Sequence, residues 1–460
     1  FMMSNNLYPI ALSDASDDEI LKHFLHAQLP DSLIADFFTF FEATKSPIAI
    51  RSSSLLEDAH YQPFAGIYST YMIPYLEDKY QMLQMLACAI KGVYASVFYR
   101  DSKAYMTATS NVIDQEKMAV ILQQVVGKDY GTRFYPTMSG VLRSLNYYPI
   151  GDEEAEEGIA SLALGLGKYI VDGGQTLRVC PYHPHQVLQT SETEMALRDT
   201  QTQFYALDMK HVGEDFKVDD GFNILKLRVK DAVEDQSLTY IASTFDPYDQ
   251  VINDGVYETG RKLITFASVL QHGVVPLPEL MQMSMKFGCN INDDRTCEFY
   301  LLQIRPIVDA KEMLDEDVKA IPDADCLLRS HNSLGHGICE DVVDVVYVKY
   351  DDHFSAMNNF YVADDIERIN RKFLAEGKNY VLIGPGRWGS SDHYLGVPVK
   401  WPHISAARVI VEVALKNYNI DPSQGTHFFQ NLTSFGVGYF TVDTNTEEGC
   451  FVNKEILDAM

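Results

Sequence analysis

Hydrophobic side chains in the first hundred residues recur at helical spacing. Between residues 14 and 45 they return every three or four positions among acidic residues, which predicts two consecutive helices. The same spacing predicts a third helix from Tyr75 to Tyr99. Between these helices the apolar run Ile48-Ala-Ile50 predicts a short strand that ends at Arg51-Ser-Ser-Ser54. An arginine and three hydroxyl groups are therefore expected at the end of a buried strand.

Continuous apolar runs further along the chain predict buried strands. Met118 to Val126 is one such run, and Phe299 to Leu302 is another. After the second run, Gln303 and Arg305 fall on one face because side chains alternate along a strand, and Pro306 ends the hydrogen-bonded ladder. This strand therefore also delivers an arginine to its carboxyl end.

The remaining segments mix helical and strand patterns. We expect helices at Glu192 to Tyr205, Gly255 to Leu270 and Ser405 to Tyr418, and a strand at Gly436 to Thr444. Residues 309 to 325 form an acidic, proline-containing stretch that suits a linker. The patterns together predict an α/β protein with a smaller C-terminal α/β domain.

Charge narrows the class of protein more than hydrophobicity does. The 460 residues include 46% hydrophobic and 22% charged residues, both ordinary for globular proteins, and the length suits about three domains. The formal net charge of -27 would repel nucleic acid and anionic membranes, and the chain has no block of Lys and Arg to reverse this. Neither is therefore expected as a partner.

The chain also lacks the usual signs of export. No apolar run approaches the ~20 residues that span a membrane, and the start lacks the basic and apolar regions of a signal peptide. Because the chain begins with Phe1, we expect it to be either a fragment of a longer chain or a processed form. Cysteines occur without a CxxC pair, and we expect reduced thiols in a cytoplasmic protein. The cysteines are Cys88, Cys180, Cys289, Cys297, Cys326, Cys339 and Cys450.

The two strand-end arginines are the first candidates for chemistry. A guanidinium fork beside hydroxyl groups suits a phosphate chain, because it donates parallel hydrogen bonds to phosphate oxygens. Arg51 and Arg305 could therefore converge on one polyanion. The alternative is that each arginine makes an ordinary ion pair.

The residues around both arginines resemble a known family. Ile48 to Tyr68 reads IAIRSSSLLEDAHYQPFAGIY, and Phe299 to Pro306 reads FYLLQIRP. They are similar to the signatures VRSS…ED…FAG and YLLQ.RP in the nucleotide-binding domain of the phosphoenolpyruvate synthase and pyruvate phosphate dikinase family. Further stretches that resemble family segments are Met118 to Val126, Gly140-Val141 and Leu162 to Gly174. The resemblance runs from Ile48 to Val308 and implies an ATP-grasp fold of two subdomains that binds ATP and Mg²⁺ for phosphoryl transfer.

The resemblance implies roles for residues at matching positions around the phosphates. Arg51 and Arg305 would bind the phosphates and stabilise the charge that develops during transfer, a catalytic role. Ser52 and Ser53 would position phosphate oxygens. Gln303 would help to hold Mg²⁺.

The resemblance also implies an adenine site and a further basic residue. Adenine would lie at the end of an apolar strand, near Gln123, Gln124 and Val126, although a core strand alone explains the same pattern. Lys103 matches the family's basic residue at the phosphates best, with Arg100 as an alternative. A solvated helix end would explain Lys103 equally well.

The chain departs from the family pattern at several places. Lys168 stands where a glutamate is usual. The family also has a strand whose carboxylate joins the glutamine in holding Mg²⁺. Here either Lys286-Phe287 occupies that place, or the strand is missing between Cys289 and Asn290. A Gly-rich turn with a phosphate-binding lysine is expected ahead of residue 1. Either the site is degenerate or segments are absent from the chain.

The C-terminal region carries two motifs without a family counterpart. Gly384 to Ser391, with Arg387 in the turn, either cradles an anion or is a tight loop in which Trp388 packs. His427 is expected to be structural, and the family's TCHAAI histidine motif does not occur in the chain. We therefore expect neither the phosphohistidine domain nor the pyruvate-binding barrel, and no phosphate acceptor can be named.

These observations predict a first ATP-grasp subdomain at residues 1–115, N-terminally incomplete, a second at 116–310, and a C-terminal α/β domain at 326–460. The expected function is that of an ATP-binding phosphotransferase. The alternative is a degenerate ATP-grasp module that binds nucleotide as a regulatory or scaffold protein, without turnover.

Overall fold

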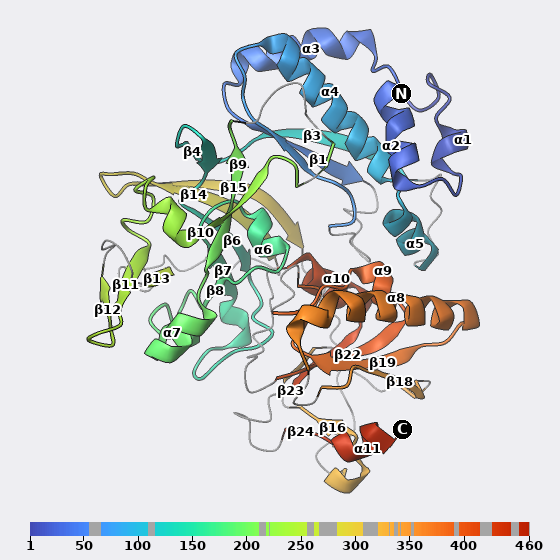
Figure 1. Cartoon of the computed structure of the whole chain (residues 1–460), viewed down its shortest axis with the longest axis vertical. Helices are drawn as coiled ribbons and strands as arrows, with labels where there is room; N and C mark the ends of the chain where they lie inside the picture. The colour runs from blue at the N-terminus through green and yellow to red at the C-terminus, as the bar shows by residue number, and fades with distance from the viewer. Residues whose placement is uncertain are drawn as a thin grey trace.

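The computed structural model describes residues 1–54, 66–108, 116–210, 218–219, 221–254, 262–265, 283–306, 321–330, 332–334, 339–340, 342–350, 354–390, 395–414, 426–442 and 450–459. Within these ranges the chain mixes helices and sheets, as the sequence predicts. Figure 1 shows an N-terminal part in which helices cover a small sheet, a middle part made mostly of strands, and a C-terminal part in which helices lie on a further sheet.

The N-terminal part is a three-stranded antiparallel sheet with helices packed on it (Figure 1). Its elements are α1 (Tyr8–Ala11), α2 (Asp17–His26), α3 (Asp31–Ala43), β1 (Ile48–Ser54), β2 (Tyr71–Ile73), α4 (Lys79–Ser96), α5 (Arg100–Ala108) and β3 (Met118–Gln124). β1 lies between β2 and β3, and its Ile48 and Ile50 share a hydrophobic cluster with Met82 and Leu86 of α4. The three helices and the strand predicted for this region are confirmed.

One stretch of this part, Lys79–Met106, is long and apolar enough to cross a membrane by length and composition alone. It is the only such stretch among the residues with described positions. Of its apolar window, 61% is buried inside the structure. The apolar residues of α4 therefore serve the protein core.

The middle part contains three sheets. Its elements are β4 (Lys128–Asp129), β5 (Arg133–Tyr135), β6 (Met138–Arg143), β7 (Ile159–Ala163), α6 (Lys168–Val171), β8 (Leu177–Val179), α7 (Thr193–Asp199), β9 (Gln203–Asp208), β10 (Ile224–Arg228), β11 (Ala242–Asp246), β12 (Val251–Asp254), β13 (Lys262–Thr265), β14 (Met283–Ile291) and β15 (Cys297–Pro306). The strand orders are β15-β14-β6-β7-β8, β10-β9-β5-β4 and β12-β11-β13. One hydrophobic cluster that includes Tyr135, Phe204 and Phe287 joins the first two sheets.

β14 is the strand whose existence the sequence left open. It is continuous from Met283 to Ile291 and pairs along its length with β15, so the alternative of a strand missing between Cys289 and Asn290 is wrong. In this pairing Lys286 lies opposite Gln303. A lysine therefore occupies the position at which the family resemblance implies a carboxylate.

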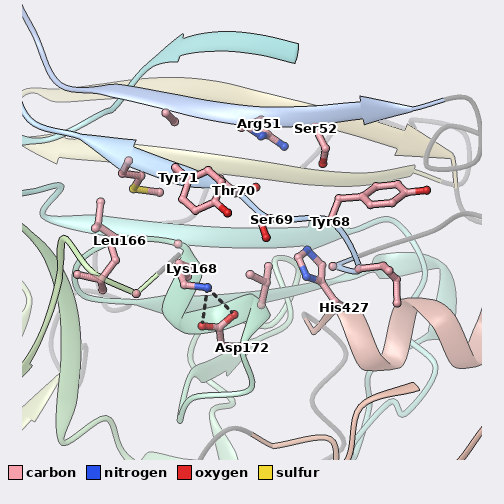
Figure 2. Close-up of a pocket in the computed structure, with 18 of the residues that line it drawn as sticks. Arg51, Ser52, Tyr68, Ser69, Thr70, Tyr71, Leu166, Lys168, Asp172 and His427 are labelled. Atoms are coloured by element: carbon pink, nitrogen blue, oxygen red, sulfur yellow. Dashed lines mark hydrogen bonds and ion pairs between the residues drawn. The ribbon is translucent and has the colours of Figure 1, made fainter. Parts of the chain in front are cut away.

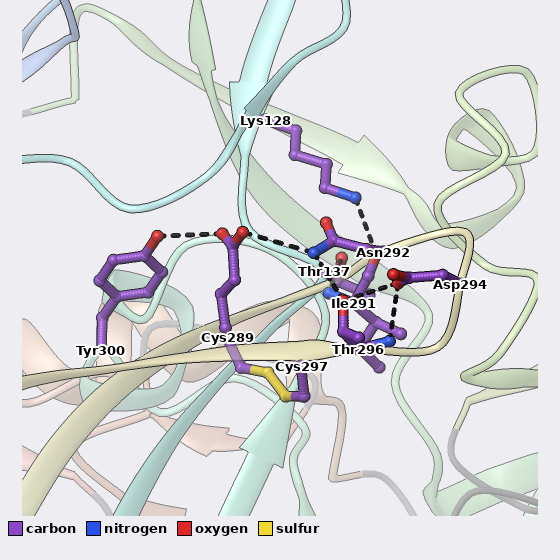
Figure 3. The surroundings of a disulfide bond; sticks show 10 residues. Lys128, Thr137, Cys289, Ile291, Asn292, Asp294, Thr296, Cys297 and Tyr300 are labelled. Carbon is purple, nitrogen blue, oxygen red and sulfur yellow. Dashed lines mark hydrogen bonds between the residues drawn. A yellow bond between two sulfur atoms is a disulfide. The ribbon is translucent and has the colours of Figure 1, made fainter.

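Two cysteines of the β14–β15 hairpin form a disulfide, which corrects the expectation that all seven are reduced (Figure 3). Cys289 pairs in the ladder with Phe299, and Cys297 pairs with Ile291, so the two lie diagonally across the hairpin. Their Cα atoms are 6.6 Å apart, within the span that a disulfide bridges. The other five cysteines are thiols outside any disulfide: Cys88, Cys180, Cys326, Cys339 and Cys450.

The C-terminal part is a mostly parallel sheet of order β17-β23-β22-β19-β18 with helices on it (Figure 1). The elements are β16 (Leu328–Arg329), β17 (Asn332–Leu334), β18 (Asp344–Tyr347), α8 (Asn359–Glu376), β19 (Tyr380–Pro385), β20 (Arg387–Trp388), β21 (Gly396–Val397), α9 (Trp401–Ile404), β22 (Ala407–Val413), α10 (His427–Phe435), β23 (Gly438–Val442), β24 (Phe451–Val452) and α11 (Lys454–Ala459). β23 confirms the strand predicted near Gly436.

Several predicted elements are wrong because pairing with distant strands overrides local pattern. Most of the described part of the helix predicted at Ser405 to Tyr418 is strand β22, whose residues from Ile410 to Val413 are all buried, and residues 415–418 lie outside the described residues. The described part of the helix predicted at Gly255 to Leu270 is strand β13, paired with β11. The helix predicted at Glu192 ends at Asp199. β15 is an edge strand rather than a buried one, and its Phe299 is 56% exposed.

The C-terminal part packs directly against the N-terminal part. Trp401 of α9 and Phe435 of α10 stack with ring centroids 4.8 Å apart. Tyr105 of α5 meets Phe435 edge-on, with centroids 5.4 Å apart. These rings belong to one hydrophobic cluster that extends to Phe24 of α2. The cluster brings the amino end of α10 toward the strands of the other two parts.

Candidate functional site

A large cavity lies where the three parts of the chain meet. Its volume is about 1390 Å³. One wall consists of residues from β1, β3 and β15, and another of residues from β14, β6 and α6. The C-terminal part contributes residues that include Gly389, Ser390 and His427. Figure 2 shows Arg51 and Ser52 on one side of this space and Lys168, Asp172 and His427 on the other.

The two strand motifs meet at Arg51. Its Nη1 donates to Oε1 of Gln123 on β3 over 2.8 Å, and its Nη2 donates to Oε1 of Gln303 on β15 over 3.0 Å. Gln123 in turn donates through Nε2 to the carbonyl of Leu302 over 3.4 Å. Arg305 lines the same cavity. Segments 252 residues apart in sequence are thus joined at one point.

Two lysines add to the positive charge of the cavity. Lys168, at the start of α6, forms an ion pair with Asp172, with 3.2 Å between Nζ and Oδ2 (Figure 2). Lys286 on β14 places its Nζ 2.9 Å from Nε2 of His427. Arg51, Lys168, Lys286 and Arg305 therefore all line one space. Such a set of cations suits an anionic ligand.

His427 enters this space from the C-terminal part, although the sequence favoured a structural role. It is the first residue of α10, whose N-cap Thr426 accepts a hydrogen bond from the amide of Phe429 over 3.0 Å. Its Nδ1 lies over Gly66, where a Cβ atom would approach within 2.4 Å of that nitrogen. Gly66 has a φ of +74°. Glycine is therefore required there both for the backbone and for the histidine.

Burial and nearby cations lower the pKa of His427 well below its usual value. Lys286, Arg305, Lys168 and Arg51 all contribute, in that order after burial. The imidazole is therefore neutral at physiological pH, and it can accept a hydrogen bond from the ammonium of Lys286.

This lowered pKa predicts a pH dependence of stability. Above pH ~6.5 the imidazole is neutral in both folded and unfolded chains. Below that pH the unfolded chain takes up a proton that the folded chain does not, so the free energy of unfolding falls by up to ~1.4 kcal/mol per pH unit. Urea unfolding at pH 7 and pH 5.5 should show a smaller loss for His427→Gln than for the wild type. Equal losses would contradict the assignment.

Some of the other predicted residues line the cavity and some do not. Ser52 lines the cavity, whereas Ser53, the next residue along β1, does not. Gln124 and Val126, predicted near adenine, line it as well. Lys103 does not: its Nζ donates to the carbonyl of Ser13 over 2.6 Å, and burial lowers its pKa.

Arg100, the alternative to Lys103, forms an ion pair with Glu367 of α8. Both basic residues therefore hold the N-terminal part together or fix it to the C-terminal part. Lys168 and Lys286, by contrast, line the cavity.

The described residues do not fit the Mg²⁺ site that the resemblance implies at Gln303. Mg²⁺ prefers carboxylate, phosphate and water oxygens in octahedral geometry. The amide oxygen of Gln303 accepts from Arg51, and the residue opposite it is Lys286. Among the described residues, no three His, Cys, Asp or Glu side chains are grouped so that they could hold a metal ion.

The loop from Gly384 to Ser391 is tight, as one of its two interpretations predicts. Trp388 is buried and donates through Nε1 to the carbonyl of Val411 over 3.1 Å. A Cβ at Gly384 would lie 2.5 Å from the Trp388 ring. The end of the loop still reaches the cavity, because Gly389 and Ser390 line it and Ser390 donates to the carbonyl of Gly173 over 3.3 Å. Ser391 lies outside the described residues.

Comparison with known proteins agrees with the sequence motifs. "Uncharacterized phosphotransferase YvkC" of Bacillus subtilis (strain 168) is 28% identical over 176 residues, which are 38% of this chain and 19% of that protein. This chain thus matches about a fifth of the length of that relative. The family described as "Pyruvate phosphate dikinase, AMP/ATP-binding domain" matches residues 9–324. Because this match covers more than half of the chain, the chain belongs to the pyruvate phosphate dikinase AMP/ATP-binding domain family.

Proposed function

We propose that the chain is an ATP-binding phosphotransferase of the ATP-grasp type. The observation that carries this proposal is the meeting of Arg51, Gln303 and Arg305 at one cavity in a chain of this family. Phosphates would lie against the two arginines, with Ser52 beside them. Arginine is suited to this role because its rigid fork matches phosphate oxygens.

The adenine end of the nucleotide would lie along β3. Gln124 and Val126 line the cavity where β3 ends, so backbone groups and an apolar side chain are both available to contact adenine. The cavity volume of about 1390 Å³ exceeds the ~300–1,000 Å³ typical of small-molecule sites. We therefore place the phosphoryl acceptor, a second substrate, in the same cavity.

A second candidate function is nucleotide binding without turnover, in a regulatory or scaffold protein. The observation that favours it is the position of Lys286 opposite Gln303, where the family resemblance implies a carboxylate. An assay for ADP formed from bound ATP distinguishes the two functions. ADP is measured by chromatography, with and without Mg²⁺. ATP binding without formation of ADP would favour the second function.

Arg51→Ala tests the phosphate site. We expect its affinity for ATP, measured by calorimetric titration, to fall roughly 10- to 100-fold, because a hydrogen bond to a charged group contributes about 1.5–3 kcal/mol. Arg368→Ala provides the control, since that arginine lies on α8 with its side chain 78% exposed and pairs with Asp365. Undiminished binding by Arg51→Ala would show that the phosphates lie elsewhere.

A further inference from the structure

We propose that the phosphate end of the cavity binds a nucleoside polyphosphate without a divalent metal ion, with the ammonium of Lys286 in the place of that ion and His427 positioning the lysine. This inference rests on the proposed nucleotide site. It specifies the ligand as the free polyphosphate anion rather than its magnesium complex.

The position of Lys286 is the first support. The ladder of β14 and β15 sets Lys286 opposite Gln303, and Gln303 contacts Arg51 over 3.0 Å. The ammonium is therefore fixed by strand register at the point where the two arginine-bearing strands meet. A divalent cation placed there would be repelled by the ammonium, whereas phosphate oxygens would be attracted to it.

The concentration of positive charge is the second support. Four cationic side chains of the cavity lie close enough to His427 to lower its pKa: Lys286, Arg305, Lys168 and Arg51. The cavity as a whole is also lined by Lys226, Lys400, Asp17, Asp18, Asp101, Asp172 and Asp219. An anion with several negative charges placed among these four cations would be attracted by each of them. A free triphosphate offers that charge without a neutralising metal ion.

The contact between Lys286 and His427 is the third support. The 2.9 Å between Nζ and Nε2 ties a lysine of the middle part to the amino end of α10. A neutral imidazole accepts one of the three ammonium protons and so fixes where the ammonium lies. His427 is itself held in place, because Thr426 caps α10 and Phe429 is buried beneath it. It thus acts as a positioning residue for Lys286.

The test is calorimetric titration of ATP and of inorganic tripolyphosphate into the full chain, with EDTA and with Mg²⁺. We expect ATP to bind in EDTA at least as tightly as in Mg²⁺. Lys286→Gln should weaken binding in EDTA at least tenfold, which is about 1.4 kcal/mol. Lys286→Glu should reverse the preference, so that ATP binds this variant only with Mg²⁺. Lys372→Gln is the control, since Lys372 lies on α8 with its side chain 77% exposed.

The role of His427 is tested by conservative rescue. His427→Phe removes the acceptor and should weaken metal-free binding about fivefold, while His427→Gln keeps an acceptor and should retain it within about twofold. The melting temperature of each variant shows whether it is folded. Equal weakening in two folded variants would overturn the positioning role.

The outcomes separate this inference from the proposed function. If ATP binds only with Mg²⁺, the metal-free site is wrong and the nucleotide site stands. If ATP binds under neither condition, the nucleotide site itself is wrong and this inference falls with it. If tripolyphosphate binds in EDTA and Lys286→Gln weakens this binding at least tenfold, the phosphate end is assigned to Lys286.

Discussion

Replacing Glu153 with alanine is expected to lower the free energy of unfolding by roughly 3–5 kcal/mol, the usual cost of leaving one charge of a buried pair alone. Glu153 forms an ion pair with Arg178, with 2.7 Å between Oε2 and Nη2 and side chains 1% and 9% exposed. The same carboxylate accepts from Asn146 over 2.9 Å and from the amide of Ile150 over 3.0 Å. Removing it leaves the buried Arg178 and Asn146 and the amide of Ile150 without this acceptor.

Urea unfolding followed by circular dichroism measures this loss. The double variant Glu153→Leu with Arg178→Met removes both charges and should recover most of it, because no lone buried charge remains. Asp365→Ala is the matched control for an exposed pair, with Asp365 and Arg368 side chains 66% and 78% exposed, and should cost less than ~1 kcal/mol. A loss of that small size in Glu153→Ala would contradict the role of the buried pair.

Phe429→Ala is expected to have a comparably large effect, roughly 3–5 kcal/mol, because it empties a buried aromatic site. Phe429 is 2% exposed. Its ring lies 6.1 Å from that of Tyr148 and 6.0 Å from that of Tyr439, and the guanidinium of Arg143 lies 5.2 Å from its centroid. The substitution removes contacts that hold α10 against the middle part.

The same unfolding experiment measures this effect, with Phe360→Ala as the control. Phe360 is 52% exposed on α8, and its loss should change stability by no more than ~0.5 kcal/mol. Phe429→Leu should cost less than the alanine variant because it fills more of the site. If Phe429→Ala were as stable as the wild type, the packing of this ring would not be what holds α10 in place.

The spacing of apolar residues correctly predicted the elements whose formation depends mainly on their own sequence. The helices before β1 and after it have a clear apolar face, so spacing alone identifies them. β1 and β15 were identified because their arginines stand in distinctive sequences. By contrast, β22 has a short apolar run that suits a helix or a strand equally, and its parallel pairing with β19 and β23 decides the outcome.

The sequence predicted only those residues of the candidate site that lie in the two strand motifs. Arg51, Gln303 and Arg305 could be proposed together because both motifs resemble parts of one family. Nothing near His427 indicates that it contacts Lys286, since that contact depends on how α10 packs 141 residues away. The disulfide was missed for a similar reason. A separation of eight residues does not show that two cysteines are close, and only the register of the hairpin brings them together.

Gly66 and His427 have a consequence for how this chain can evolve. A side chain at position 66 would collide with the imidazole, and the backbone there has a φ that favours glycine. Replacement of the glycine would require a smaller residue at 427 as well, and replacement of the histidine alone would release the steric part of the constraint on 66. The two positions should therefore covary among descendants that retain both the N-terminal strands and the C-terminal sheet.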